Sequence, residues 1–81
     1  MKIKVLYFSS LKDKLGKNME DIDLPENSTV EDLISTLKEK YSEISDSLDN
    51  VMLALNEEYV EKNTPVKDGD TVALIPPVSG G

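Results

Sequence analysis

At 81 residues and 9.0 kDa the chain is long enough for one domain, and its 38% apolar content is low for a globular protein. It contains no Cys and no His, which excludes a thiolate nucleophile, a Ser-His relay, a disulfide and a zinc site with the usual nitrogen and sulfur ligands, so we expect no metal. The 16 acidic residues outnumber the 9 lysines and give a net charge of −7, which disfavours nucleic acid and anionic membranes as partners.

No segment of the sequence has the pattern of a targeting or membrane signal. The N-terminal apolar run, residues 5–8, ends at Ser9 and is shorter than the roughly 7–15 residues of a signal-peptide core. No run approaches the ~20 apolar residues of a membrane span. Because disulfides are impossible, a reducing compartment suits the chain, and we expect a cytoplasmic protein.

The first half of the chain predicts a strand, a short helix and a second strand. Residues 3–8 are rich in β-branched and aromatic types, which favour a strand. Ser9 and Ser10 can cap a short helix that Gly16 ends. Residues 19–24 alternate between acidic and apolar side chains, as expected of a strand with one buried face.

The main helix is predicted to begin at Ser28. Ser28 and Glu31 have the spacing of a capping box, in which each side chain satisfies a free backbone N–H at the helix start. Apolar residues then recur at helical spacing and form one stripe, namely Val30, Leu33, Ile34, Leu37 and Tyr41. The stripe indicates that one face of this helix packs against a core.

The second half of the chain predicts three more strands, at residues 51–55, 59–60 and 71–75. The Pro-Pro pair at 76–77 ends the last strand, since proline cannot donate to a sheet ladder.

One long helix can cover only one face of a small sheet, so the order of elements predicts an α+β fold. A β-grasp (ubiquitin-like) fold satisfies this order, with a mixed sheet of about five strands and one main helix on one face. A ferredoxin-like fold would need two long helices. We therefore expect a β-grasp domain at residues 1–75 and an extended, flexible tail at residues 76–81.

The sheet face away from the helix is predicted to be apolar in part. The charge of Lys4 indicates that it points outward, which places Leu6 and Phe8 on the same outer face. In a β-grasp sheet the first and last strands are neighbours, so Ala73 and Ile75 would join them in one patch. Such a patch usually marks a protein partner. The alternative is that the short helix or a loop covers it.

The tail has the composition of a segment that threads a narrow channel. Prolines favour an extended chain, and five residues after Pro76 reach roughly 17 Å. Gly80 and Gly81 have no side chains to collide with channel walls. The residues predicted to thread are Pro76, Pro77, Val78, Ser79 and Gly80. The alternatives are a flexible end without function and the remnant of a tag.

The carboxyl group of Gly81 is the predicted reactive group. A terminal carboxylate is ionised at neutral pH and is a weak nucleophile. Attack on the α-phosphorus of ATP would convert it to an acyl adenylate, from which a sulfur donor could make a thiocarboxylate. Because the chain has no Cys, any sulfur that it carries must be held at this end.

The sequence resembles the family of small sulfur-carrier subunits of molybdopterin synthase (the MoaD family) over nearly its whole length. The similar segments are 3–8, 15–16, 30–33, 55–56 followed by Val60, and 68–73. The most specific one is the ending Pro-Pro-Val-Ser-Gly-Gly, which matches the family's Pro-Pro-Val-(Ser/Thr)-Gly-Gly.

This resemblance implies that an ATP-dependent, E1-like adenylating enzyme activates Gly81 and that a sulfurtransferase system makes the thiocarboxylate. The tail would then enter the active site of the large synthase subunit, where its sulfur converts cyclic pyranopterin monophosphate into molybdopterin. Two carriers would flank a dimer of large subunits, and the outer patch would contact the partners. The carrier would bind no cofactor and would not be catalytic alone, since the partner enzyme uses the ATP.

Three alternatives remain open from the sequence. The chain could be a ubiquitin-like sulfur carrier of another pathway, such as thiamine synthesis or tRNA thiolation, although the thiamine carrier is usually shorter and lacks the Pro-Pro-Val stretch. It could be a ubiquitin-like modifier joined to lysines of other proteins. It could also be a passive β-grasp interaction module whose tail has no role.

Overall fold

The computed structural model of the chain describes residues 1–77. Its elements, in chain order, are β1 (Lys2–Tyr7), α1 (Ser9–Leu15), β2 (Met19–Asp23), α2 (Val30–Lys40), the short 3₁₀ helices η1 (Ser42–Ile44) and η2 (Ser47–Asn50), β3 (Met52–Leu55), β4 (Glu58–Tyr59) and β5 (Thr71–Ile75).

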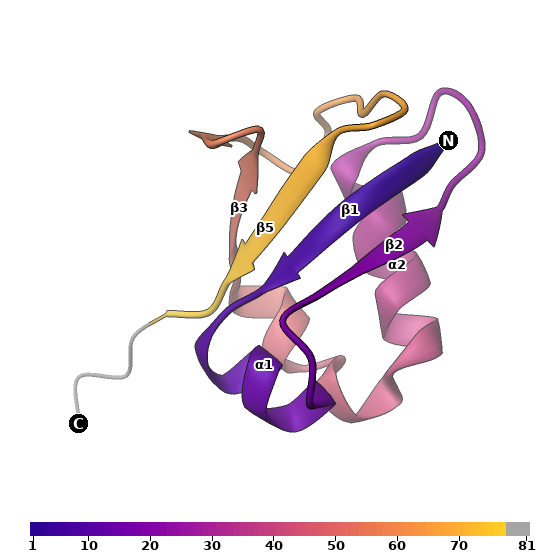
Figure 1. The fold of residues 1–81 in the computed structure, drawn as a ribbon. Helices are drawn as coiled ribbons and strands as arrows, with labels where there is room; N and C mark the ends of the chain where they lie inside the picture. The colour runs from indigo at the N-terminus through magenta and orange to yellow at the C-terminus, as the bar shows by residue number, and fades with distance from the viewer. Residues whose placement is uncertain (78–81) are drawn as a thin grey trace.

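The strands form one mixed sheet in the order β2-β1-β5-β3-β4. The first and last strands, β1 and β5, lie parallel at its centre, and every other pairing is antiparallel. The view of Figure 1 looks onto this sheet, with α2 behind it and α1 at the end where β1 and β5 finish. The predicted β-grasp fold, with five strands and one main helix on one face, is therefore confirmed.

The core lies between α2 and the sheet. The predicted apolar stripe of α2 is buried except at Tyr41, which is half-buried at the end of the helix. It meets the inward residues of the strands, which alternate with outward ones as the pleat requires. The largest fully buried side chains are Tyr7, Ile3, Leu11, Leu33, Leu37, Ile44, Leu48 and Leu74.

The start of α2 differs from the prediction by one residue. Thr29, not Ser28, is the N-cap: its hydroxyl accepts from the backbone N–H of Asp32, whose carboxylate accepts in turn from the backbone N–H of Thr29 at 2.8 Å. The predicted box of Ser28 and Glu31 is wrong because the Ser28 hydroxyl is used elsewhere. It is buried and donates to the carbonyl of Pro25 at 2.7 Å, which closes the preceding turn.

The short helix α1 is where the sequence predicted it, but its start is not capped by Ser9 or Ser10. Phe8 is the N-cap residue and makes no side-chain cap hydrogen bond. The end is as predicted, since Gly16 has φ +70°, in the left-handed region that favours glycine, and its N–H donates to the carbonyl of Lys12.

Several strand ends differ from the prediction by one residue: β1 is Lys2–Tyr7 instead of 3–8, β2 is Met19–Asp23 instead of 19–24, and β3 is Met52–Leu55 instead of 51–55. The first strand ends at Tyr7 because Phe8 already belongs to the turn into α1. The short fourth strand is Glu58–Tyr59 instead of 59–60, because a two-residue turn at 56–57 brings the chain back onto β3.

Candidate functional site

The outer face of the sheet, away from α2, carries a row of apolar residues that crosses all five strands. The register pairs Leu6 with Met19 on one side and with Ala73 on the other, and pairs Ala54 with both Ala73 and Tyr59. Paired residues project from the same face of a sheet. We call such a row of paired residues a level of the sheet. One level of the outer face is therefore apolar from one edge of the sheet to the other.

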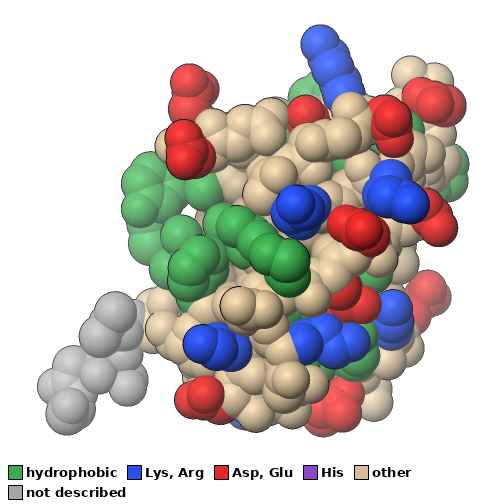
Figure 2. Space-filling model, in the orientation of Figure 1, with side chains coloured by type: hydrophobic (Ala, Val, Ile, Leu, Met, Phe, Trp, Pro, Cys, Tyr) green, Lys and Arg blue, Asp and Glu red, His purple; other side chains and the backbone are tan. Residues whose placement is uncertain are grey.

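A second apolar level lies beside the first, toward the end where β5 finishes. Ile75 pairs with Met52 there, and Phe8 follows Leu6 by two residues, which keeps it on the same face. We call these eight residues the apolar patch: Leu6, Phe8, Met19, Met52, Ala54, Tyr59, Ala73 and Ile75. Figure 2 shows hydrophobic side chains gathered over β3 and β5, next to the place where the described chain ends.

The centre of the apolar patch is hollowed. The hollow has a volume of about 590 Å³ and is lined by Leu6, Phe8, Ala54, Asn56, Glu57, Tyr59, Thr71, Ala73 and Ile75. All four residues that the sequence placed in one patch lie along it. Phe8 is 43% exposed and Tyr59 70% exposed, so neither α1 nor a loop covers this face. An apolar surface of this kind can take a protein partner.

The sequence prediction named four of the eight patch residues and missed Met19, Met52, Ala54 and Tyr59. Met52 and Ala54 lie on β3, beside β5, whereas Met19 and Tyr59 lie on the edge strands, so the membership of all four depends on the register between strands. Period-2 alternation shows which residues of a strand share a face, but it does not show which residues of two strands lie side by side.

The other half of the outer face is polar. The next level along the sheet pairs Lys4 with Asp21 and with Thr71, and the level beyond pairs Lys2 with Asp23. The Asp68 carboxylate accepts from the backbone N–H of Lys2 at 2.7 Å. The outer face is thus divided, with its apolar half at the end from which the chain leaves β5.

The beginning of the predicted tail lies beside the apolar patch. Pro76 is still buried and Pro77 is exposed. The other residues predicted to thread a channel, Val78, Ser79 and Gly80, and the predicted reactive residue Gly81 lie outside the described residues. Their roles, and the division of the chain at residue 75, therefore stay predictions.

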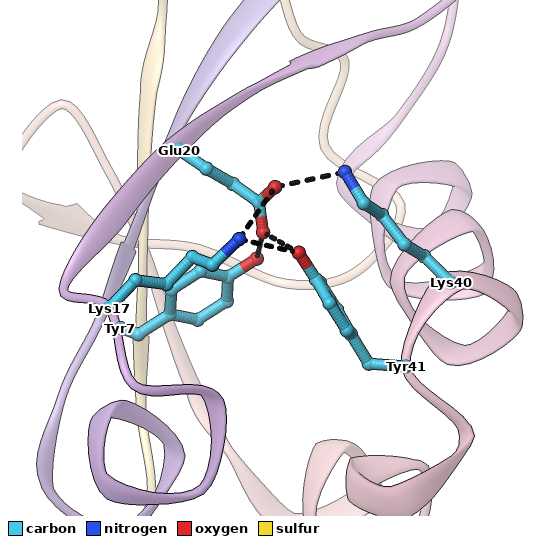
Figure 3. A network of polar contacts seen from close by, with 5 residues as sticks. All are labelled: Tyr7, Lys17, Glu20, Lys40 and Tyr41. Carbon is cyan, nitrogen blue, oxygen red and sulfur yellow. Dashed lines mark hydrogen bonds and ion pairs between the residues drawn. The ribbon is translucent and has the colours of Figure 1, made fainter.

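A polar network lies on the inner side of the sheet edge, at the end of β1 (Figure 3). The Glu20 carboxylate accepts from the hydroxyl of Tyr7 at 2.6 Å, from the hydroxyl of Tyr41 at 2.7 Å and from the ammonium of Lys40 at 3.0 Å. Lys17 lies 3.8 Å from the same carboxylate and donates to the Tyr41 hydroxyl. Strands β1 and β2 and the end of α2 are thereby joined through one carboxylate.

The pKa values of Glu20 and Tyr7 are shifted in directions that stabilise the network. Burial alone would raise the pKa of Glu20, but the hydrogen bonds from Tyr7, Tyr41 and Lys40 outweigh it and hold the pKa below its ordinary value. Burial, followed by the hydrogen bond to Glu20, raises the pKa of the Tyr7 hydroxyl. Glu20 therefore stays ionised and Tyr7 neutral at pH 7, which is the state of a structural anchor and not of an acid–base pair that exchanges protons.

Two further features of residues 1–77 bear on function. Within this range no three carboxylates gather into a cluster that could hold a metal ion. No helix of the described chain is long and apolar enough to cross a lipid bilayer.

The chain is similar to known proteins over its whole length. A model of the ThiS family matches residues 5–81. A protein of Dictyostelium discoideum named molybdopterin synthase sulfur carrier subunit is 43% identical over 81 residues, a match that covers 96% of this chain and 94% of that protein.

Solved structures have the same fold. A putative molybdopterin converting factor, subunit 1, from Pyrococcus furiosus has a TM-score of 0.87 at 35% identity, covering 96% of this chain and 99% of that one. A chain in the complex of subunits 1 and 2 of molybdopterin-converting factor from Helicobacter pylori has a TM-score of 0.74 at 32% identity, covering all of both chains. SAMP1 from Haloferax volcanii has a TM-score of 0.90 at 24% identity, which shows the fold alone.

Proposed function

The chain belongs to the ThiS family, and we propose that it is the sulfur carrier subunit of a molybdopterin synthase. The observation that carries the proposal is the full-length likeness to relatives with that name. The ending Pro-Pro-Val-Ser-Gly-Gly, predicted from the sequence as the chemically active segment, supports it.

The proposed chemistry takes place at the carboxyl group of Gly81. Its oxygen attacks the α-phosphorus of ATP in the active site of an E1-like adenylating enzyme, which forms an acyl adenylate and releases pyrophosphate. A sulfur donor at the oxidation level of sulfide, supplied through a sulfurtransferase, then attacks the acyl carbon. The new C–S bond replaces the bond to AMP and leaves a thiocarboxylate.

The proposed acceptor is the large subunit of molybdopterin synthase, in which the thiocarboxylate provides sulfur to cyclic pyranopterin monophosphate. Support comes from the Helicobacter pylori relative, whose structure is a complex of subunits 1 and 2. We propose an assembly of two carriers with a dimer of large subunits, in the cytoplasm.

The arrangement of the described residues suits this delivery. The apolar patch lies at the end of the sheet where β5 finishes, and Pro76 and Pro77 follow directly. A partner that binds the patch therefore holds the start of the tail at a fixed place on its own surface. Gly81 is then within roughly 17 Å of Pro76 when the intervening residues are extended. Leu6, Phe8, Ala73 and Ile75 are the proposed partner contacts.

The test is a mass measurement on the full chain after incubation with ATP, the adenylating enzyme and a sulfur source. We expect the mass gain of one oxygen-to-sulfur replacement, and fragmentation should place it on Gly81. The control is a chain that lacks Gly81, which should fold normally and gain no mass. A modification at any other residue would contradict the proposal.

The same experiment separates the sulfur carrier from two of the three alternatives. A protein modifier would yield isopeptide-linked conjugates with other proteins and no free thiocarboxylate. A passive interaction module would yield neither product, and its partner-dependent activity would survive the loss of Gly81.

A further inference from the structure

Glu57 occupies an unusual backbone position at the margin of the hollow. The turn between β3 and β4 consists of Asn56 and Glu57, whose φ angles are +50° and +73°. Two residues with positive φ in a two-residue hairpin loop form the turn in which Asn is favoured first and Gly second. A glutamate in the second position is strained, because its Cβ is unfavourable in the left-handed region.

The side chain of Asn56 has a structural role in this turn, but that of Glu57 has none. The Asn56 amide donates to the carboxylate of Asp70 at 3.1 Å, and its oxygen accepts from the backbone N–H of Thr71 at 3.0 Å. Within residues 1–77 the carboxylate of Glu57 has neither a hydrogen bond nor an ion pair. Nothing in the fold explains why a strained glutamate is present where a glycine would fit better.

Glu57 does line the hollow, and it is the only Asp, Glu, Lys or Arg among the residues that line it. Its neighbour Glu58 is also exposed but pairs with Leu55, on the opposite face from the pair of Tyr59 and Ala54. The chain thus has two adjacent glutamates, of which one borders the hollow and one does not.

A partner that covers the apolar patch must also take water away from the Glu57 carboxylate. Removing water from an unpaired carboxylate is costly, and the cost is offset only when the partner supplies a cation or hydrogen-bond donors at that point. A rim charge of this kind also steers a partner of opposite charge during encounter and selects against the wrong one.

We propose that Glu57 is a specificity-determining residue of the apolar patch, whose carboxylate pairs with a Lys or Arg side chain of the large synthase subunit. The pair forms at the margin of an apolar contact that fills the hollow. This inference rests on the proposed function, because it takes the large subunit as the partner that covers the patch.

The test measures the affinity and association rate of the full chain for the large subunit, at low and at high salt. The variants are Glu57→Gln, which removes the charge and keeps the size, and Glu58→Gln as the matched control. We expect Glu57→Gln to weaken binding about tenfold or more, with a slower association rate that depends less on salt. Glu58→Gln should bind like the unmodified chain.

A third variant uses the strain in the turn. Glu57→Gly should raise the thermal unfolding midpoint, because glycine adopts the left-handed conformation without strain, and should weaken binding as much as Glu57→Gln. A variant that is more stable and yet binds more weakly cannot owe its loss to misfolding.

A fourth variant, Phe8→Ala, separates failure of this inference from failure of the proposed interface. Suppose that Phe8→Ala abolishes binding. If Glu57→Gln then binds normally, or if Glu57→Gln and Glu58→Gln weaken binding equally, the inference about Glu57 is wrong and the proposed interface stands. If Phe8→Ala also binds normally, the large subunit does not bind the patch, and both the inference about Glu57 and the proposed interface are overturned.

Discussion

The hydroxyl of Tyr7 donates a hydrogen bond of 2.6 Å to the carboxylate of Glu20 at the inner edge of the sheet. Tyr7 is the last residue of β1, and the next residue, Phe8, belongs to the apolar patch on the opposite face. The network around Glu20 therefore fixes the point at which the chain passes from the core to the proposed interface.

Removing the charge of Glu20 should destabilise the fold. Glu20→Gln weakens three charge-assisted hydrogen bonds around a mostly buried carboxylate, so we expect a loss of about 2 kcal/mol in the free energy of unfolding. The control is Asp21→Asn, an isosteric change at the next residue, which lies on the exposed outer face and should change stability by less than about 0.5 kcal/mol. Urea unfolding measures the stability of both variants. Equal losses in the free energy of unfolding would show that the hydrogen bonds to Glu20 do not stabilise the fold more than an exposed carboxylate does.

Stability should depend on pH at both extremes. The pKa of Glu20 is lower in the folded chain than the roughly 4.3 of an unfolded Glu, so its contribution is present above that pH and is lost as the pH falls through the folded pKa. The pKa of Tyr7 is higher than the roughly 10 of an unfolded Tyr, so its contribution is present below pH ~10 and is lost as the pH rises toward the folded pKa.

Thermal unfolding at a series of pH values, with Glu20→Gln beside the unmodified chain, measures this dependence. The variant should lose less stability on acidification. Some loss should persist, because the hydrogen bond from Lys38 also holds the pKa of Asp49 below its usual value. If the stability of the two proteins falls equally as the pH is lowered, the role given to Glu20 is contradicted.

The position of the helix cap can be tested by two substitutions. Thr29→Ala removes the acceptor for the backbone N–H of Asp32 and should cost about 1 kcal/mol of stability. Glu31→Ala should cost at most a few tenths of that, because Glu31 is not the residue that reaches back to the cap. A larger loss for Glu31→Ala than for Thr29→Ala, in urea unfolding, would favour the box predicted from the sequence.

In the segment that follows β1, truncating a buried side chain and truncating an exposed side chain to Ala should change stability by different amounts. Leu11→Ala removes a fully buried side chain of α1 and should cost about 2–5 kcal/mol in the free energy of unfolding. Phe8→Ala removes a side chain that is 43% exposed, so it should cost less than about 1.5 kcal/mol. Calorimetry provides the stabilities, and a loss for Phe8→Ala as large as that for Leu11→Ala would show that Phe8 belongs to the core.

Much of the fold follows from the sequence because its signals are local. The apolar stripe that begins at Val30 fixes the main helix, and Gly16 fixes the end of the short helix. Strand alternation near the centre of the sheet placed Leu6 and Ala73 on the outer face, and the structure pairs them. The cap of α2 was missed by one residue because Ser28 and Thr29 both suit a cap.

The sequence by itself determined the order of elements, the β-grasp fold and the likeness to a sulfur-carrier family, because spacing, turn residues and the Gly-Gly ending are properties of neighbouring residues. Only the tertiary structure decided that Glu20 anchors Tyr7 and Tyr41. It also decided that Met19 and Tyr59 extend the patch to both edges of the sheet. Finally, it decided that Glu57 borders the hollow while Glu58 does not. These relationships depend on the register between strands, which is set by packing across the whole sheet and is not written in any single segment.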